Sequence, residues 1–187
     1  MRVAKDRPLK LRPEWFARDA TIVAPDLVGK ILAIRSGPRR VSRFVISETE
    51  AYTADDPASH AFRGKTQRNL SMFEPPGTIY VYFIYGMYHC LNLVTGTTGD
   101  GQAVLIRALI PLDKNLAAKG FSGPGKLCRA LGIDKSYDGK SIFSARAPLW
   151  IEESHLPKAL KLKSSTRIGI SKATEKLWRW ELDHDAL

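Results

Sequence analysis

Cysteine is scarce in this chain of 187 residues, which contains only Cys90 and Cys128. The two lie far apart and neither belongs to a Cys-x-x-Cys pair, which argues against a disulfide framework or a zinc ribbon. The cysteines also do not stand at metal-ligand spacing from any of the four histidines, His60, His89, His155 and His184. We therefore expect no metal and no cofactor, and interpret both cysteines as small buried hydrophobic residues in a reducing cytoplasm.

The sequence also lacks a long uninterrupted apolar segment. The longest apolar run, Ile79 to Val94, is interrupted by Gly86, His89 and Asn92 and is rich in tyrosine, which argues against a membrane span. The first eight residues contain no apolar core of the kind that a signal peptide needs. We expect no targeting signal and a cytoplasmic location.

Linkers, repeats and low-complexity tracts are absent as well. A chain of 187 residues can bury one good-sized core, so we expect residues 1–187 to form a single domain, with residues 1–12 as a loose basic N-terminus.

Acidic residues are fewer than basic ones. The chain has 29 lysines and arginines against 19 aspartates and glutamates, a formal net charge of +10 and a pI near 9.8. A domain this basic attracts polyanions, so nucleic acid is the first partner to consider. The alternatives are a generally basic enzyme or a basic patch for a membrane surface, and no arginine-rich amphipathic helix supports the membrane version.

What the sequence does have is an aromatic stretch from Thr78 to Asn92. Strand periodicity places side chains alternately on two faces, with Ile79, Val81 and Phe83 on one and Tyr80, Tyr82 and Ile84 on the other. Tyr85-Gly86-Met87-Tyr88 then predicts a hairpin turn, because Gly86 can adopt a positive φ. A turn that presents large side chains is a wedge of the kind that opens a DNA duplex; the alternative is that these tyrosines close a core.

A second strand is predicted at Phe44–Tyr52. Its alternation places Glu48, Glu50 and Tyr52 on one face, with about 7 Å between successive members. An aromatic ring holds a flat, electron-poor base by stacking, and a desolvated carboxylate beside it can accept a proton from water. The pattern indicates a catalytic site.

The aromatic and acidic motifs together resemble the alkyladenine (3-methyladenine) DNA glycosylase family, the monofunctional base-excision repair enzymes of the bacterial type. The resemblance extends from about Leu11 to about Trp180. The residues that carry it are Glu48-Thr-Glu-Ala-Tyr52, His60, Arg68-Asn69, Met72-Phe73, Pro76-Gly-Thr-Ile-Tyr-Val-Tyr82, Tyr85-Gly-Met-Tyr88 and Asn92. This chain has tryptophans near Leu177–Trp180 where the family has a proline and a Phe-Tyr pair, which leaves the C-terminal packing open.

The resemblance implies a role for each site residue. Glu50 acts as general base, Arg107 helps to hold Glu50 and the attacking water, and the backbone carbonyl of Ile168 reaches that water. The base pocket consists of Tyr52, His60, Tyr82 and Asn92. Tyr85, with Met87 nearby, fills the gap that the extruded nucleotide leaves. The implied partner is double-stranded DNA with damaged purines, bound by a monomer at the nucleoid.

Basic residues outside the pocket predict phosphate contacts. Arg63, Lys65 and Arg68 lie in a long polar loop after Tyr52. Lys126 lies in a predicted helix, Gly123 to Gly132, whose N-terminal amides form a phosphate seat; a capped amphipathic helix would look the same. The other reading of the loop is a solvated segment.

The remaining elements complete an α+β prediction: a single mixed domain with a curved, largely antiparallel sheet, flanking helices and a protruding hairpin. The expected elements are a helix starting at Pro13–Glu14, a helix capped by Asp19 and running from Thr21 to near Leu32, a turn at Ser36–Arg40, a buried strand at Gln102–Ile110 that contains Arg107, an edge strand at Pro148–Glu153, and a basic loop at Lys158–Ser165.

Two rival functions fit parts of the pattern. One is a nucleic-acid-binding module with a stacking platform and no chemistry. The other is a metal-dependent nuclease built on Glu48, Glu50, Asp55 and Asp56. The pocket segments contain no lysine for a Schiff base, so no strand-cutting activity is expected.

Overall fold

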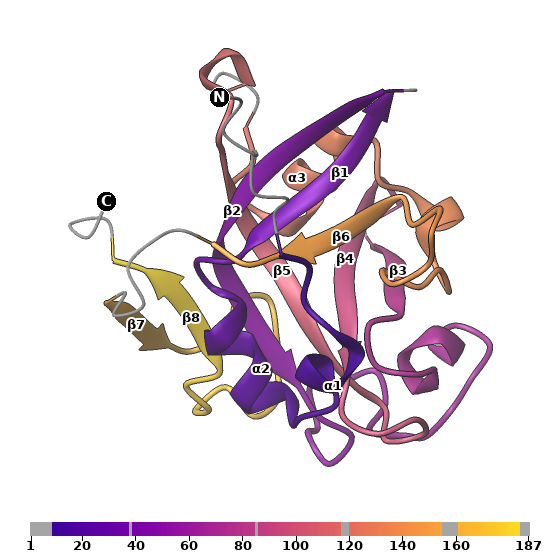
Figure 1. Cartoon of the computed structure of the whole chain (residues 1–187). Helices are drawn as coiled ribbons and strands as arrows, with labels where there is room; N and C mark the ends of the chain where they lie inside the picture. The colour runs from indigo at the N-terminus through magenta and orange to yellow at the C-terminus, as the bar shows by residue number, and fades with distance from the viewer. Residues whose placement is uncertain (1–8, 38, 85, 117–119, 155–160, 184–187) are drawn as a thin grey trace, which may run out of the picture.

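The computed structural model describes residues 9–37, 39–84, 86–116, 120–154 and 161–183, and these form a curled antiparallel sheet with helices packed against it (Figure 1). The strands are β1 (Ile31–Gly37), β2 (Arg40–Tyr52), β3 (Ile79–Ile84), β4 (Tyr88–Thr95), β5 (Gln102–Pro111), β6 (Leu149–Glu152), β7 (Leu162–Ser165) and β8 (Arg179–Leu182). The α-helices are α1 (Pro13–Phe16), α2 (Ala20–Leu27) and α3 (Pro124–Leu131), and the 3-10 helices are η1 (Leu70–Phe73), η2 (Lys114–Leu116) and η3 (Lys135–Tyr137).

The strands pair in the order β3-β4-β5-β2-β1-β6, and every pair is antiparallel. β8 pairs with β2 and with β7, so β7 and β8 lie on one side of the molecule and β3 on the other (Figure 1). The predicted α+β class with a curved antiparallel sheet is confirmed.

The long strand β2 changes neighbours along its length. Its first half, through Val45, pairs with β1, whereas Glu48–Glu50 pair with β8 instead. The ladder between β2 and β5 shifts register on both sides of Glu48 and skips Arg107. Bulges of this kind often re-aim side chains beside active sites, and here the irregularity lies among the predicted catalytic residues.

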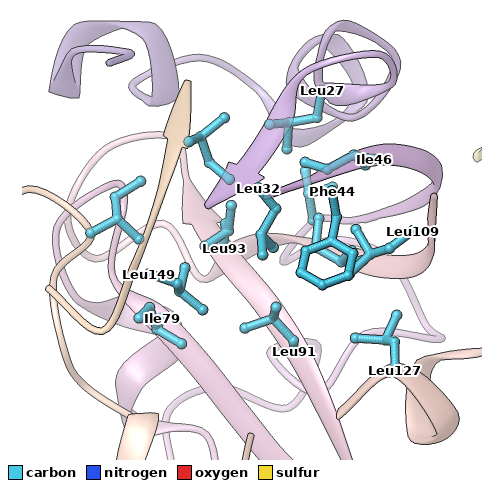
Figure 2. Close-up of a cluster of buried hydrophobic side chains, with 14 of the residues drawn as sticks. Leu27, Leu32, Phe44, Ile46, Ile79, Leu91, Leu93, Leu109, Leu127 and Leu149 are labelled. Carbon is cyan, nitrogen blue, oxygen red and sulfur yellow. The ribbon is translucent and has the colours of Figure 1, made fainter. Parts of the chain in front are cut away.

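Alternation along β3, β4 and β5 separates two apolar clusters. One face of the sheet covers the main core, in which side chains from α2, α3 and six strands pack together, as the labelled leucines, Ile46, Ile79 and Phe44 show (Figure 2). The opposite face carries a smaller cluster around Tyr80, Val94 and Ala103, against which Tyr52 and Tyr82 pack. The predicted site therefore lies on the face away from the main core.

The hairpin between β3 and β4 is confirmed. Gly86 has a φ of 66°, and the amide of Met87 donates a hydrogen bond to the carbonyl of Ile84 at 3.2 Å. Ile79 and Val81 are fully buried in the main core, but Phe83, predicted on the same face, is 47 % exposed and packs against the ring of His89 at 4.9 Å.

The predicted helix from Thr21 to near Leu32 is wrong in its second half. α2 ends at Leu27, Gly29 takes a φ of 88°, and Ile31–Gly37 form a strand. Gly29 breaks the helix, and the apolar residues after it gain two strand partners, β2 and β6, that outweigh helical spacing. The Asp19 cap is confirmed, since its carboxylate accepts the amide of Thr21 at 2.8 Å.

The predicted loop Lys158–Ser165 is also wrong where it is described, because Leu162–Ser165 form β7 and pair with β8; residues 158–160 lie outside the described ranges. Residues 9–12, predicted as loose, pack beside β6: Leu11 is buried and its amide donates to the carbonyl of Ile151 at 3.0 Å. β6 stands at the end of the strand order, as an edge strand should.

Helix α3 confirms the predicted segment from Gly123 to Gly132. Pro124 is its first residue, and Gly132 ends it in the left-handed conformation. The helix packs against β4 and β5, at the end of the sheet that carries Arg107. Across the described residues, no helix combines the length and apolar character needed to cross a membrane.

Candidate active site

Glu50 is fully buried, and three groups hold its carboxylate. The hydroxyl of Tyr52 donates to Oε2 at 2.7 Å, the backbone amide of Ile168 donates to Oε1 at 2.8 Å, and Nη1 of Arg107 lies 3.2 Å from Oε1. Tyr52 follows Glu50 on β2, Arg107 comes from the neighbouring β5, and Ile168 comes from the segment between β7 and β8. Three separate parts of the chain therefore fix one carboxylate.

The protonation states of Glu50 and Tyr52 follow from their burial. Burial raises the pKa of Glu50, although the charge of Arg107 and the hydrogen bonds from Ile168 and Tyr52 oppose the rise. Burial and the neighbouring carboxylate raise the pKa of Tyr52 well above its ordinary value. Tyr52 consequently remains a phenol that donates its hydrogen bond, and Glu50 is a stronger base than an exposed glutamate.

A row of alternating charges extends from Glu50 toward β8. Arg107 Nε donates to Glu48 Oε1 at 3.0 Å, and Arg179 Nη1 donates to the same oxygen at 2.8 Å. Arg179 Nε also donates to the carbonyl of Thr166 at 3.1 Å, two residues before Ile168. Arg179 thus supports two of the three groups that hold Glu50: Arg107, through Glu48, and Ile168, through the segment that carries it. The predicted carboxylate partner for Arg107 is confirmed.

A second buried charge pair lies behind Tyr52. Arg167 and Asp56 have fully buried side chains and form an ion pair, and Arg167 Nη1 also donates to the carbonyl of Ala51 at 2.9 Å. The guanidinium carbon lies 4.7 Å from the centre of the Tyr52 ring and 5.2 Å from that of Trp178. This pair supports the ring of Tyr52 and fixes the residue that precedes Ile168.

The predicted pocket residues line one cavity of about 300 Å³. Its walls include all four predicted pocket residues and the two groups predicted to assist Glu50: Tyr52, His60, Tyr82, Asn92, Arg107 and Ile168. Glu50 lies behind this wall and reaches the cavity through its partners. A cavity of this size and lining is typical of a site for a flat small molecule or a single base.

Tyrosines orient the histidine at the cavity edge. His60 Nδ1 lies 2.9 Å from the hydroxyl of Tyr80, and the His60 ring meets the Tyr82 ring edge-on at 4.5 Å between centroids. Burial of the imidazole, with the nearby charge of Arg68, lowers the pKa of His60. A neutral imidazole can present either a donor or an acceptor at Nε2, depending on its tautomer.

Asn92 and Cys90 form the inner wall from β4. The Asn92 amide nitrogen donates to the carbonyls of Tyr80 at 3.1 Å and Cys90 at 3.3 Å, which ties β4 to β3. Asn92 is 3 % exposed, so its amide is fixed. Cys90 is buried and free, as predicted, and burial raises the pKa of its thiol to about 11. Cys128 is likewise buried and free.

The structure describes all the predicted DNA-facing residues except Tyr85. Met87, at the hairpin turn, is 65 % exposed; Tyr85, its predicted companion, lies outside the described residues. Arg63 and Arg68 share a second cavity next to His60. Lys65 instead lies 5.9 Å from the ring centre of Phe73, and Lys126 is exposed on the first turn of α3.

The four carboxylates of the nuclease alternative do not converge on one point. Glu48 and Glu50 share Arg107, Asp56 pairs with Arg167, and Asp55 accepts a hydrogen bond from Thr53 at 2.5 Å. Within the part of the chain that the structure describes, no group of three or more histidines, cysteines, aspartates or glutamates could hold a metal ion.

Sequence reasoning missed the residues that support the site. The roles of Tyr80, Asp56, Arg167 and Arg179 were not predicted, although strand alternation already placed Tyr80 beside Tyr82. The other three act through partners that are distant in sequence: 111 residues separate Arg167 from Asp56 and 131 separate Arg179 from Glu48. No local pattern reports such pairs.

Known proteins resemble this chain over most of its length. Residues 14–186 match the methylpurine-DNA glycosylase family. A protein of Trichodesmium erythraeum named "Putative 3-methyladenine DNA glycosylase" is 45 % identical over 184 residues, covering 90 % of this chain and 91 % of the relative. Proteins with the same name from Synechococcus sp. (strain JA-3-3Ab) and Rickettsia felis are 46 % identical over 180 residues and 43 % identical over 169; the alignments cover 89 % of this chain and 92 % and 89 % of the relatives.

Proposed function

This chain belongs to the methylpurine-DNA glycosylase family, and we propose that it flips alkylated or deaminated purines out of duplex DNA and hydrolyses their N-glycosidic bond with a water activated by Glu50. The proposed lesion class comprises 3-methyladenine, 7-methylguanine, hypoxanthine and etheno-adenine. The observation that carries this proposal is the buried carboxylate of Glu50, held by Tyr52, Arg107 and the Ile168 amide beside an aromatic cavity of about 300 Å³.

The lining of the cavity favours a damaged purine. Tyr52 and Tyr82 provide ring faces between which a flat base can stack, and His60 provides a hydrogen-bonding edge. A purine nucleotide methylated at N3 or N7 is cationic, so an electron-rich ring attracts it. The same positive charge makes it a good leaving group, so little acid catalysis is needed.

Glu50 is placed to act as the general base. A carboxylate has about four acceptor positions. Tyr52 and Ile168 engage two of them and Arg107 Nη1 lies 3.2 Å from Oε1, which leaves at least one position for a water. In the proposed step this water attacks the sugar carbon through an oxocarbenium-like state, the bond electrons leave with the base, and the proton passes to Glu50.

Two groups assist this step in the proposal. Arg107 holds Glu50 and the water, and the carbonyl of Ile168 accepts a hydrogen bond from the water. The backbone of Ile168 already contacts Glu50 through its amide, which supports a position of this residue next to the reacting atoms. The reaction as proposed needs neither metal nor cofactor.

Extrusion of a nucleotide from a duplex costs a few kcal/mol. We propose that Tyr85 and Met87 fill the gap in the base stack, and that Arg63, Lys65, Arg68 and Lys126 contact phosphates. The exposed side chain of Met87 at a tight turn supports the wedge. The net charge of +10 supports phosphate binding, and the protein is proposed to bind as a monomer.

Asn92 is proposed to reject normal guanine. Its amide is buried and tied to two backbone carbonyls, so it cannot move away from an exocyclic amine at the floor of the pocket. We expect Asn92→Ala to release guanine from undamaged DNA faster than the wild type while retaining its action on methylated purines. Free guanine measured by chromatography tests this selectivity.

The decisive experiment measures free base. The protein is incubated, with chelator present, with a duplex that carries a single hypoxanthine or with methylated DNA, and Glu50→Gln is the matched control. We expect release by the wild type and a loss of about a thousandfold or more in the variant, with binding retained. Tight binding without release by either protein would favour the binding module, and abolition by chelator would favour the nuclease.

A separate experiment tests the absence of strand cutting. The lining of the cavity contains no lysine among the described residues, which supports a monofunctional reaction. Incubation with damaged DNA and borohydride should leave protein and DNA separate. A covalent adduct would contradict the monofunctional assignment.

A further inference from the structure

A second cavity, of about 380 Å³, lies on the other side of His60 from the base pocket. Its walls include Arg63, Arg68 and Lys172, together with the polar residues Ser59 and Thr66. No aspartate or glutamate lines it among the described residues. Lys172 comes from the segment after Ile168, whereas the two arginines come from the loop after Tyr52, so two distant parts of the chain bring three cations together.

These cations lack acidic partners. In the described ranges neither Arg63 nor Lys172 forms an ion pair or hydrogen bond, and Arg68 makes only a long hydrogen bond, at 3.4 Å, from Nη2 to the carbonyl of Phe83. Nearby like charges without a counter-ion repel one another, and an anion placed among them relieves the repulsion. The chemistry of this cavity therefore fits an anion.

One buried side chain holds the loop in shape. Asn69 is 2 % exposed; its Oδ1 accepts hydrogen bonds from the amide of Thr66 at 2.6 Å and the Thr66 hydroxyl at 3.0 Å. Its Nδ2 donates to the carbonyls of His60 at 2.8 Å and Gly64 at 3.0 Å. The loop that carries both arginines is thus fixed from within, although it contains no helix or strand, so the cavity is a preformed site.

The place of the cavity identifies the anion. His60 lines both cavities, so the three cations lie one side chain away from the base pocket. A nucleotide whose base fills the first cavity carries its phosphates outside the mouth, within reach of the second. Resting on the proposed function, we infer that this cavity seats one backbone phosphate of the strand that carries the flipped nucleotide, and that Lys172 contacts this phosphate together with Arg63 and Arg68.

The inference separates the cations around the site. Lys65 and Lys126 do not line this cavity, so any phosphates they contact differ from the one seated here. Lys172, by contrast, joins the phosphate site although it lies more than a hundred residues along the chain from the loop. Replacing this one phosphate with an uncharged group should therefore change DNA binding by a Lys172 variant and by a Lys65 variant to different degrees.

The test replaces single phosphates with uncharged methylphosphonates. Duplexes that carry a reduced abasic site, which cannot release a base, are prepared with one methylphosphonate at each position on either side of that site. For the wild type we expect one position at which the substitution weakens binding about threefold to tenfold. Lys172→Gln should weaken binding to the unmodified duplex by a similar factor. In this variant the methylphosphonate at that position should weaken binding no further.

Lys65→Gln is the matched control, because it removes a charge from the same loop but should retain the penalty at that position. Arg63→Gln serves as a second variant and should behave like Lys172→Gln. Equal penalties in Lys172→Gln and the wild type at every position would overturn the inference.

Parallel release of hypoxanthine separates this inference from the proposed function. Base release with equal penalties would overturn the phosphate seat and leave the reaction intact. A penalty that Lys172→Gln abolishes, without base release by the wild type, would support the seat and contradict the glycosylase reaction.

Discussion

Two groups of charged side chains flank the cavity lined by Tyr52, His60, Tyr82 and Asn92, and they differ in how their charges are balanced. Behind the pocket, Glu48, Glu50 and Asp56 are each held by an arginine, and most of these side chains are buried. In front of it, Arg63 and Lys172 have no acidic partner in the described ranges. Buried charges must be paired within the fold, whereas cations at a binding surface can await an anionic ligand.

This contrast teaches where a substitution will act. A change in the inner group, which comprises Glu48, Glu50, Asp56, Arg107, Arg167 and Arg179, should alter stability or the chemical step. A change in the outer group, which comprises Arg63, Arg68 and Lys172, should alter DNA binding and its salt dependence alone. Four predictions test this division, and they follow in order of decreasing effect.

The largest effect is expected from Arg167→Met. Removing this guanidinium leaves the buried carboxylate of Asp56 with Lys176, at 3.9 Å, as its one remaining counter-ion among the described residues. We expect the free energy of unfolding, measured with urea, to fall by about 3–5 kcal/mol. The control is Lys163→Met, which breaks the exposed pair with Glu181 at 3.8 Å and should cost less than about 1 kcal/mol. Equal losses of unfolding free energy in the two variants would contradict the expectation that a buried pair of the inner group contributes more than an exposed pair.

Arg179→Gln should slow turnover. Arg179 holds Glu48 and the carbonyl of Thr166, so its loss loosens both Arg107 and the segment of Ile168 without touching the substrate. We expect kcat for hypoxanthine release to fall about tenfold to a hundredfold, with KM little changed. Arg18→Gln, which removes a distant exposed pair with Asp26, is the control and should leave kcat unchanged. A change in KM alone would place Arg179 in the outer group.

The pH dependence should reveal the raised pKa of Glu50. Base release needs the ionised carboxylate, so the acid limb of kcat/KM, which reports the free enzyme, should lie above the ordinary glutamate value of 4.5. Because folding raises this pKa, the group favours folding below the unfolded value and loses this contribution as the pH rises through the folded value.

The stability of Glu50→Gln tests the direction of this pKa shift independently of activity. Glutamine mimics the protonated acid, and Arg107 keeps Glu48 as its partner. The variant should therefore match the wild type in acid and become the more stable protein toward neutral pH, as thermal unfolding at several pH values would show. A variant that loses stability relative to the wild type as the pH rises would contradict the raised pKa of Glu50.

The smallest effect on the protein itself is expected from Arg63→Gln. No interaction of its side chain within the described residues would be lost, so the free energy of unfolding should stay within about 0.5 kcal/mol of the wild type. Its effect should appear in DNA binding, where the slope of log K against log salt falls by about 1. An unchanged slope together with a lower stability would reverse its assignment to the outer group.

Much of the site could be predicted because it depends on alternation within strands. Period-two spacing placed Glu48, Glu50 and Tyr52 on one face, and the contacts of Arg107 and Tyr52 confirm it. The same spacing separated Tyr80 and Tyr82 from the core residues Ile79 and Val81.

Prediction failed where the partners of a segment decide its structure. Ile31–Ile34 carry helical spacing but form a strand, because β2 and β6 lie on both sides of them. Leu162–Ser165 gain their strand only from β8. Such pairing depends on elements far away in the sequence, which a local window does not contain.

The sequence by itself determined the faces of the strands, the hairpin turn at Gly86 and the capped helix α3. Each of these depends on residue type and spacing within a few positions, where backbone geometry leaves little choice. Only the tertiary structure decided that Arg167 would pair with Asp56, that Arg179 would hold Glu48, and that Lys172 would join Arg63 and Arg68. Each of these groups contains residues from distant segments of the chain. Packing in three dimensions, and not position in the sequence, decides which charged side chains meet a partner and which do not.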